Sequence, residues 1–403
     1  MAAPLRIQSD WAQALRKDEG EAWLSCHPPG KPTLYGSLTC QGIGQDGIPE
    51  VTASEGFIVN EINKALIQSL SLPTSLLISA LYLLGQTKSI HISCPKENAS
   101  SKFLAPYTTF SRIHSKSITC LDISSGGGLG VSSSTDGSMK IWQASNGELR
   151  RVLEGHVFDV NCCRFFPSGL VVLSGGMDAQ LKIWSAEDAS CVVTFKGHRG
   201  GILDTAIVDR GRNVVSGSRD GTARLWDCGR SACLGVIADC GSSINGVAVG
   251  AADNSINLGS PEQTPSVPLC WLRCLQLLHF SLWLLAVGWD TGWKHLSAGR
   301  EESKVFRCEL SDYSYYSWNR IKRAPVQVIH RSGAPVLSLL SFRDGFIASQ
   351  GDGSCFIVQQ DLDYLIELTG TDCDPVFKVA TWEKQIYTCC RDGLVRRYQL
   401  SDL

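Results

Sequence analysis

Three similar stretches decide the fold: VSSSTDGSMKIW at 131–142, LSGGMDAQLKIW at 173–184 and VSGSRDGTARLW at 215–226. Each stretch has the pattern of a strand, a tight turn at an aspartate and a second strand that ends in tryptophan. The turn aspartates Asp136, Asp178 and Asp220 are 42 residues apart. A fixed period of this length is the signature of a repeat protein, and here each repeat is built from β-strands.

Three further residue types keep the same period. A histidine stands 22 residues before each turn aspartate, a serine four before it and a tryptophan six after it. A Ser-His-Asp set is also found in serine hydrolases, but three copies at the repeat period favour a structural role over catalysis. The three sets are His114, Ser132, Asp136 and Trp142; His156, Ser174, Asp178 and Trp184; and His198, Ser216, Asp220 and Trp226.

This pattern resembles the WD-repeat family, and Gly155-His156 and Gly197-His198 match the family's glycine-histidine pair. The resemblance implies an all-β fold, a β-propeller whose blades are four-stranded antiparallel sheets. It also implies that each set of four side chains forms one hydrogen-bonded chain. That chain would run from the tryptophan indole through serine and histidine to the turn aspartate, and it would hold the blade together.

The remaining chain predicts more blades of the same kind. Asp220 and Asp352 are 132 residues apart, which leaves room for two blades between their turns. The degenerate unit at Asp352 has His330 in register, whereas the last unit keeps Asp392 and Tyr398 but has Gly370 in the histidine position. We therefore predict a seven-bladed propeller over 101–403, closed by strand 103–110 pairing with the C-terminal blade.

Residues 1–100 lack the repeat and predict a small N-terminal extension domain. A short helix is expected from Trp11 to Lys17, and strands are expected at 34–43 and 56–62. Two segments differ in composition from their surroundings. They are the uncharged stretch 65–87 and the segment 267–322, which holds five of the eleven tryptophans. They are an apolar insertion and a diverged fifth blade, or else alternative segments from a variant transcript.

The composition excludes several classes of function. The formal charge of −2 lacks the excess of positive charge that a general nucleic-acid binder needs. Neither 65–87 nor the 16 uncharged residues between Arg273 and Asp290 are a convincing membrane span, and the first thirty residues lack a signal peptide. The seventeen cysteines show no metal-ligand spacing, so we expect reduced, structural thiols, no metal and a cytoplasmic protein, with the nucleus as a second location. No motif for catalysis or for a cofactor is present.

The ends of the chain, LRIQSDWAQALRKDEGEAWLSCHPPGKP at 5–32 and QIYTCCRDGLVRRYQLSDL at 385–403, resemble a subfamily of WD-repeat proteins that associate with the proteasomal ATPases. The resemblance implies a monomeric, non-enzymatic assembly chaperone. It would bind ATPase subunits of the proteasome regulatory particle at their C-terminal domains and restrain premature association with the core particle.

Three alternatives to this function remain open. The first is a substrate receptor of a cullin-type ubiquitin ligase, although the Trp226-Asp227-Cys228-Gly229 stretch lacks the arginine usual in such receptors. The second is a membrane anchor at 267–289, and the third is an inactive variant with a disrupted fifth blade. For binding a protein partner, the candidate contacts are loop residues beside the repeated sets, namely Phe158, Asp159, Met177, Arg199 and Arg219.

Overall fold

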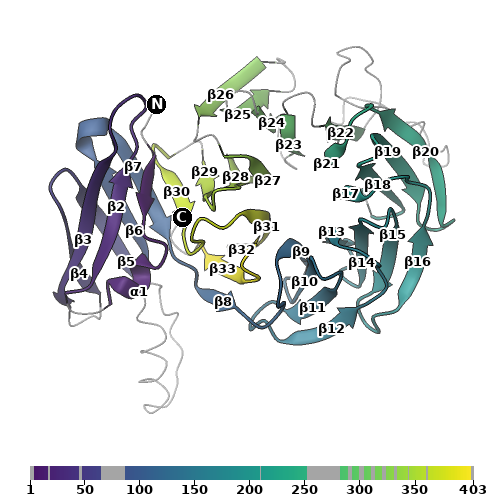
Figure 1. Cartoon of the computed structure of the whole chain (residues 1–403), viewed down its shortest axis with the longest axis horizontal. Helices are drawn as coiled ribbons and strands as arrows, with labels where there is room; N and C mark the ends of the chain where they lie inside the picture. Colours follow the sequence, from purple (N-terminus) through teal and green to yellow (C-terminus); the bar gives the residue numbers. More distant parts are fainter. Residues whose placement is uncertain are drawn as a thin grey trace.

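The computed structural model describes residues 4–16, 19–44, 48–64, 87–208, 210–251, 282–288, 293–298, 304–309, 314–319, 324–330, 334–343, 345–359 and 362–400. Nearly all secondary structure in these ranges is β-strand. Four-stranded antiparallel sheets follow one another around a common centre, as in a WD propeller, and the N-terminal sheets lie beside them (Figure 1). The predicted 65–87 insertion, apart from Thr87, lies outside the described residues.

The three repeats with complete sets form three four-stranded sheets, each in chain order. In each sheet the turn aspartate lies between the second and third strands, and the tryptophan lies in the third. The strands are β9 (Ile118–Ile123), β10 (Leu129–Ser134), β11 (Met139–Gln143) and β12 (Leu149–Leu153); β13 (Val160–Phe165), β14 (Val171–Gly176), β15 (Leu181–Ser185) and β16 (Cys191–Phe195); and β17 (Ile202–Val208), β18 (Asn213–Ser218), β19 (Thr222–Asp227) and β20 (Ala232–Asp239).

The region of unusual composition also contains sheets. A two-stranded sheet, β21 (Ile244–Ala251) and β22 (Leu282–Gly288), is followed by a four-stranded one, β23 (Trp293–Ala298), β24 (Lys304–Glu309), β25 (Ser314–Asn319) and β26 (Ala324–His330). At the level of the backbone, the second half of 267–322 is therefore a sheet like its neighbours, despite having no turn aspartate and tryptophan at the repeat spacing. Residues 252–281 lie outside the described residues.

The C-terminal third forms two more sheets of the repeating kind. The first is β27 (Val336–Phe342), β28 (Gly345–Gln350), β29 (Cys355–Val358) and β30 (Leu365–Leu368). The second is β31 (Val376–Trp382), β32 (Gln385–Cys390) and β33 (Val395–Gln399), and its fourth strand is β8 (Thr108–Phe110), which comes from the other end of the chain.

The predicted strand 103–110 is two strands in the structure. Pro106, which has no N–H to donate to a sheet, separates β7 (Ala99–Leu104) from β8. Only β8 pairs with β33, in the register that places Phe110 opposite Val395. β7 instead runs parallel to β30, with Leu104 opposite Leu368. The two halves of the predicted strand therefore bind neighbouring sheets.

The N-terminal domain packs two sheets around one apolar core. The sheet β1 (Leu5–Ile7), β2 (Glu21–Cys26), β3 (Leu34–Ile43) and β4 (Pro49–Ala53) faces β5 (Ile58–Lys64), β6 (Thr87–Cys94) and β7. The helix α1 (Trp11–Ala14) is shorter than predicted, and Lys17 lies outside the described residues. The fully buried Trp11 belongs to this core, together with Leu24, Leu38 and Ile92.

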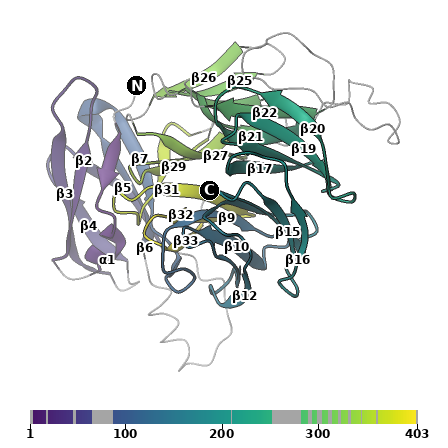
Figure 2. The same cartoon turned by 45° about the vertical axis from the view of Figure 1, so that its right-hand side comes forward.

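The N-terminal domain is joined to the last two sheets by direct hydrogen bonds. Strands β5, β6 and β7 continue the sheet β27–β30 (Figure 1 and Figure 2). The indole N–H of Trp11 donates to the hydroxyl of Thr369 (3.0 Å), and that hydroxyl donates to the carbonyl of Leu104 (3.0 Å). The predicted boundary at residue 100 therefore cuts through β7, a strand that both parts share.

The first strands of successive sheets surround the centre. In chain order β9, β13, β17, β21, β23, β27 and β31 each contact the next, and β31 contacts β9. Apolar side chains fill the spaces between sheets, with the buried Trp184 and Trp226 in one cluster and Trp142 beside Tyr387 in another. The sheets thus share their cores with their neighbours, so each depends on the next for its stability.

Candidate functional site

The repeated side chains lie in contact in the second and third repeats. In the second repeat, the indole N–H of Trp184 donates to the Ser174 hydroxyl (2.8 Å), which lies 2.7 Å from His156 Nε2, and Nδ1 of that histidine lies 2.8 Å from Asp178 Oδ2. The third repeat has nearly the same geometry. Its distances are 2.8 Å for Trp226–Ser216, 2.7 Å for Ser216–His198 and 2.9 Å for His198–Asp220.

The first repeat differs at its last link. Trp142 donates to Ser132 (3.1 Å) and Ser132 contacts His114 Nε2 (2.8 Å), as in the other repeats. Asp136, however, reaches the histidine through a third residue. The Ser138 hydroxyl donates to Asp136 Oδ1 (2.6 Å) and lies 3.4 Å from His114 Nδ1. The predicted direct contact between His114 and Asp136 is therefore replaced by a serine-bridged one.

Burial keeps the three histidines neutral. It lowers the pKa of His114 to about 4, with a further contribution from the Lys140 ammonium. It also lowers the pKa of His156 and of His198, although each faces an aspartate that acts in the opposite direction. A neutral ring can donate from Nδ1 to the carboxylate and accept at Nε2 from the serine hydroxyl. Each N–H and O–H of the Trp–Ser–His–Asp network then donates one hydrogen bond, in the direction from tryptophan to aspartate.

The turn carboxylate also organises the turn itself. Its Oδ1 accepts the backbone N–H two residues ahead in five sheets, at 2.9 Å from Ser138, 3.2 Å from Gln180, 2.9 Å from Thr222, 3.1 Å from Ser354 and 2.9 Å from Leu394. The residue after each aspartate has a positive φ, which favours glycine. That residue is Gly137, Gly221, Gly353 or Gly393 in four sheets and Ala179 in the other.

Sequence reasoning missed two arginines that bind turn aspartates in the last two sheets, one of which, Arg396, takes the place of histidine in the last sheet. Arg6 of the N-terminal domain binds Asp352 Oδ2 (3.0 Å), and Arg396 binds Asp392 Oδ2. Gly370 leaves space for the latter guanidinium, because a Cβ at this position would lie 3.2 Å from Arg396 Nε. A signal for Arg396 was present in the sequence: the residue four after the turn aspartate is basic in each complete repeat as well.

The turn aspartates also hold the backbone of the candidate binding loops. Asp220 Oδ2 accepts the backbone N–H of Arg199 (2.8 Å), and Asp178 Oδ2 accepts that of Val157 (3.4 Å). The backbone N–H of Arg219 donates to Gly201 O (2.8 Å). The rigid repeats therefore fix the positions of these loops at one edge of the sheets.

The side chains on these loops are mostly exposed. Val157 and Phe158 are 75% and 60% exposed, which is unusual for large apolar residues and is typical of a contact surface. The side chains of Asp159, Arg199 and Arg219 are also exposed, whereas Met177 is half-buried against Gly201 of the next sheet. We call Val157, Phe158, Asp159, Arg199 and Arg219 the loop face.

A cavity of about 310 Å³ lies among the first strands of the sheets. Its wall repeats at the 42-residue period: Thr119, Asn161, Leu203 and Asn245 form one column, and Cys120, Cys162 and Asp204 another. Lys378 lies on the same wall, and Arg164 binds Asp204 nearby (3.1 Å). The cavity wall therefore combines two thiols and polar or charged groups with the apolar side chains of Leu203, Val336, Leu337 and Phe377.

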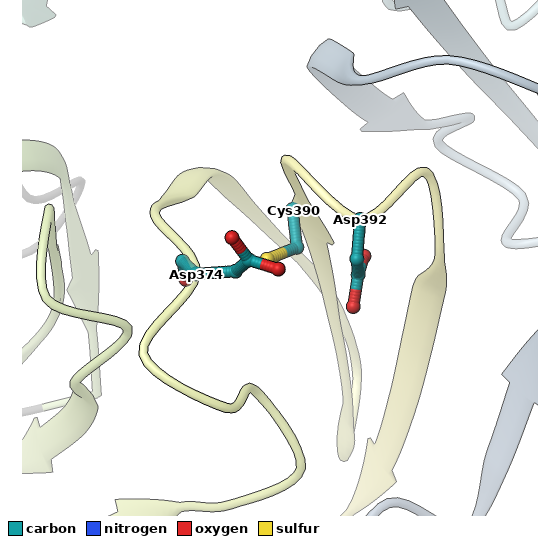
Figure 3. Close-up of side chains that lie close together, drawn as sticks. All are labelled: Asp374, Cys390 and Asp392. Carbon is teal, nitrogen blue, oxygen red and sulfur yellow. The ribbon is translucent and has the colours of Figure 1, made fainter.

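One group of potential metal ligands occurs among the described residues. Asp374, Cys390 and Asp392 lie close together at the end of the last sheet (Figure 3). Both carboxylates already bind arginines, since Arg391 contacts Asp374 Oδ1 (2.7 Å) and Arg396 contacts Asp392. Burial raises the pKa of the Cys390 thiol to about 11. The group is therefore satisfied as an ion-pair cluster and lacks the thiolate that a metal would need.

Among the described residues, no helix is long and apolar enough to cross a membrane. The cysteines whose side chains the structure describes are free thiols, and most of them are buried.

The comparisons agree with the repeat pattern. A family model described as WD domain, G-beta repeat matches residues 105–143, 147–185 and 189–227. The chain is 76% identical over 425 aligned residues to proteasomal ATPase-associated factor 1 of Homo sapiens, and 68% identical over 415 to that of Gallus gallus, each across the full length of both chains. It is 30% identical over 167 residues to a probable proteasomal ATPase-associated factor 1 of Dictyostelium discoideum, which covers 41% of this chain and 33% of that one.

Proposed function

Because this chain belongs to the proteasomal ATPase-associated factor 1 family of WD-repeat proteins, we propose that it is an assembly chaperone that binds ATPase subunits of the proteasome regulatory particle. It binds them at their C-terminal domains and restrains premature association with the core particle. It acts as a monomer in the cytoplasm and the nucleus. It binds without catalysis, without a cofactor and without nucleic acid.

The observation that carries this proposal, beyond family membership, is the rigid loop face. Exposed Phe158 lies in a loop whose backbone is held by Asp178, and exposed Arg199 in a loop held by Asp220. Loops fixed before binding lose little conformational entropy when a partner docks. The aromatic side chain supplies contact area, and the arginines supply orientation and specificity.

A chaperone of this kind needs no chemical step. A partner that covers one surface of an ATPase subunit sterically excludes any other protein from that surface. Release follows when the competing interface binds more tightly, so the control resides in relative affinity.

The rigidity that this function requires is supported by ring closure. We infer seven blades and a closed ring, with residues 252–281 inserted between the strands β21 and β22. Two observations support closure: β8, which directly precedes the first repeat, completes the last sheet, and β31 contacts β9. The hydroxyl of Ser117 also donates to the carbonyl of Arg391 (2.8 Å), across the same junction.

The test is direct binding between the purified full chain and separately purified ATPase subunits, measured by calorimetry for each subunit and for its C-terminal domain alone. We expect saturable, stoichiometric binding to at least one subunit. We also expect slower association of that subunit's subcomplex with the core particle when the chain is present. Binding to no subunit would overturn the proposal, and capture of a cullin-ligase adaptor instead would favour the ubiquitin-ligase alternative.

A further inference from the structure

The wall of the central cavity carries a cation that the proposed function does not use. Lys378 of β31 lines the cavity, and its ammonium group makes no hydrogen bond or ion pair with any of the described residues. The carboxylate on the same wall, that of Asp204, is already bound. Arg164 lies 3.1 Å from its Oδ1, and the backbone N–H of Val247 donates to its Oδ2 (3.0 Å). Within the described part of the wall, Lys378 is therefore the charge that remains for a ligand.

Two asparagine amides on this wall supply uncharged donors. The Nδ2 atom of Asn245 is buried and has no hydrogen-bond partner among the described residues, which is rare for a buried polar atom. Nδ2 of Asn161 donates to the carbonyl of Ile202 (2.7 Å), which uses one of its two N–H groups and leaves the other. The polar part of the wall thus fits an anionic group with oxygen acceptors.

Another part of the wall is apolar, and it limits what the anionic group is attached to. This part consists of Leu203, Val336, Leu337 and Phe377. The cavity volume of about 310 Å³ is on the order of ten times the ~30 Å³ that a water molecule occupies in the liquid, so it admits a small organic body. One unpaired ammonium balances a single negative charge, which favours a carboxylate over a phosphate group with nearly two.

The cavity lies at the end of the first strands that is nearest the loop face. Asn161 is the second residue of β13 and follows Phe158 and Asp159 by three and two residues. Leu203 is the second residue of β17 and follows Arg199 by four. None of the five loop-face residues lines the cavity itself. A carboxylate therefore has two possible sources, a free small molecule or the end of a partner chain that docks on the loop face.

We propose that the central cavity is a binding site for a carboxylate carried on a short apolar body. The Lys378 ammonium pairs with the carboxylate, and the amides of Asn245 and Asn161 donate hydrogen bonds to its oxygens. Phe377 and Leu337 pack against the apolar body. This site is additional to the proposed binding of ATPase subunits, and separate measurements test it.

The experiment titrates the full chain with benzoate and with hexanoate at neutral pH and fixed ionic strength, and follows binding by ligand-observed nuclear magnetic resonance. Benzamide and hexanamide, which have nearly the same shape without the charge, are the matched controls. We expect saturable binding of at least one acid at one site, at least about tenfold tighter than that of its amide. No saturable binding of either acid, or equal binding of acid and amide, would overturn the proposal.

Variants place the ligand at Lys378, with circular dichroism as the check on folding. Lys378→Met removes the charge and should weaken binding of the acid by at least about tenfold, whereas Lys378→Arg keeps the charge and should retain binding. Lys384→Met is the matched control, because Lys384 is exposed in the turn after β31 and does not line the cavity. Wild-type affinity for a folded Lys378→Met protein would contradict the proposal.

A second variant keeps the test decisive if Lys378→Met does not fold. Asn245→Asp is nearly the same shape, but it replaces an amide donor with a carboxylate that repels the ligand. It should weaken binding of the acid at least as strongly as Lys378→Met. Unchanged binding by a folded Asn245→Asp protein would remove this wall from the site.

A short peptide distinguishes the two sources of the carboxylate. Acetyl-Gly-Gly-Leu with a free C-terminus is compared with the same peptide ending in an amide. Tighter binding of the free-ended peptide than of hexanoate would assign the site to the end of a partner chain, whereas binding of the free acids alone would assign it to a small molecule. Equal and saturable binding of the peptide and its amide would show that the cavity does not recognise a carboxylate.

Discussion

The histidine-containing sheets and the last sheet solve one structural problem in two ways. In both, the turn carboxylate accepts the backbone N–H two residues ahead, at 2.9 Å in the turns of Asp220 and Asp392. The other carboxylate oxygen binds neutral His198 in one case and charged Arg396 in the other. The aspartate turn is therefore the common element, and its second partner is interchangeable.

The two solutions differ in what else they connect. The histidine passes the hydrogen-bonded chain on to a serine and a tryptophan within its own sheet. In the last sheet, the hydroxyl of Tyr398 instead donates to the carbonyl of Thr369 (2.6 Å), a residue that also binds Trp11 of the N-terminal domain. The first network stiffens one blade, and the second joins the propeller to its extension.

The largest difference in stability between the two networks is expected when the aromatic residue of each is changed. Trp226→Ala removes a fully buried side chain and leaves Ser216 without its donor, so it should cost about 3–5 kcal/mol of stability. Tyr398→Phe removes only a hydroxyl and should cost about 1 kcal/mol. Chemical denaturation measures both changes. Equal losses would contradict the separate roles.

The next effect concerns the turn aspartates and links stability to binding. Asp220→Ala leaves the His198 Nδ1–H and the Arg199 backbone N–H without their acceptor, so we expect a loss of about 2 kcal/mol. Because the Arg199 loop is released, binding to the ATPase subunit should also weaken. Asp392→Ala is the control, since it frees Arg396 but no loop-face residue. Unchanged binding by a folded Asp220→Ala protein would show that the turn aspartate does not position the loop face for binding.

Acid should lower the stability of the protein through the buried histidines of the first three repeats. Unfolded histidines take up protons below about pH 6.5, whereas burial lowers the folded pKa of His114 to about 4. Stability is therefore full above pH 6.5 and is lost as the pH falls toward 4, by about 1 kcal/mol for this histidine between pH 7 and pH 5.5.

Thermal unfolding at a series of pH values tests this prediction. His114→Gln should reduce the slope of stability against pH in this range. Arg396→Lys should leave the slope unchanged, because neither cation titrates there. A slope that His114→Gln does not alter would show that this ring is not buried in the neutral form.

The smallest effect lies in one turn. Ala179 has a φ of 61°, where the equivalent residues of neighbouring repeats are Gly137 and Gly221. An L-residue is strained in this region of backbone space, so Ala179→Gly should stabilise the protein by up to about 1 kcal/mol. Gly221→Ala is the converse change and should destabilise it. Thermal unfolding of the two variants would contradict this account if they shifted in the same direction.

The sequence predicts the local features that repeat. It does not predict contacts between residues that are far apart in the chain. The period of 42 locates the sheets of the first three repeats, because their turns are built from neighbouring residues. The contact between Arg6 and Asp352 joins residues 346 positions apart and leaves no periodic trace. The prediction of one strand at 103–110 overlooked Pro106, and the pairing of β7 with a sheet other than that of β8 has no local signal.

The candidate site was predictable to the same extent. Phe158, Asp159, Arg199 and Arg219 were chosen from their place beside the repeated sets, whereas Val157 was not, and the structure adds that aspartates hold the backbone of Val157 and Arg199. Part of the cavity wall also follows the repeat, since Thr119, Asn161 and Asn245 lie in one column at multiples of the 42-residue period. The place of Lys378 on the same wall was not predictable, because β31 does not align with this column at the 42-residue period.

The central claim is that the chain binds a proteasomal ATPase subunit through its loop face, and one pair of variants tests it most directly. Arg219→Glu reverses a charge on this face, and Arg212→Glu makes the same change at an exposed residue on the opposite edge of the same sheet. The account predicts that calorimetry shows weaker binding for Arg219→Glu by at least about tenfold, and wild-type affinity for Arg212→Glu. Wild-type affinity for a folded Arg219→Glu protein, or equal losses for both variants, would contradict it.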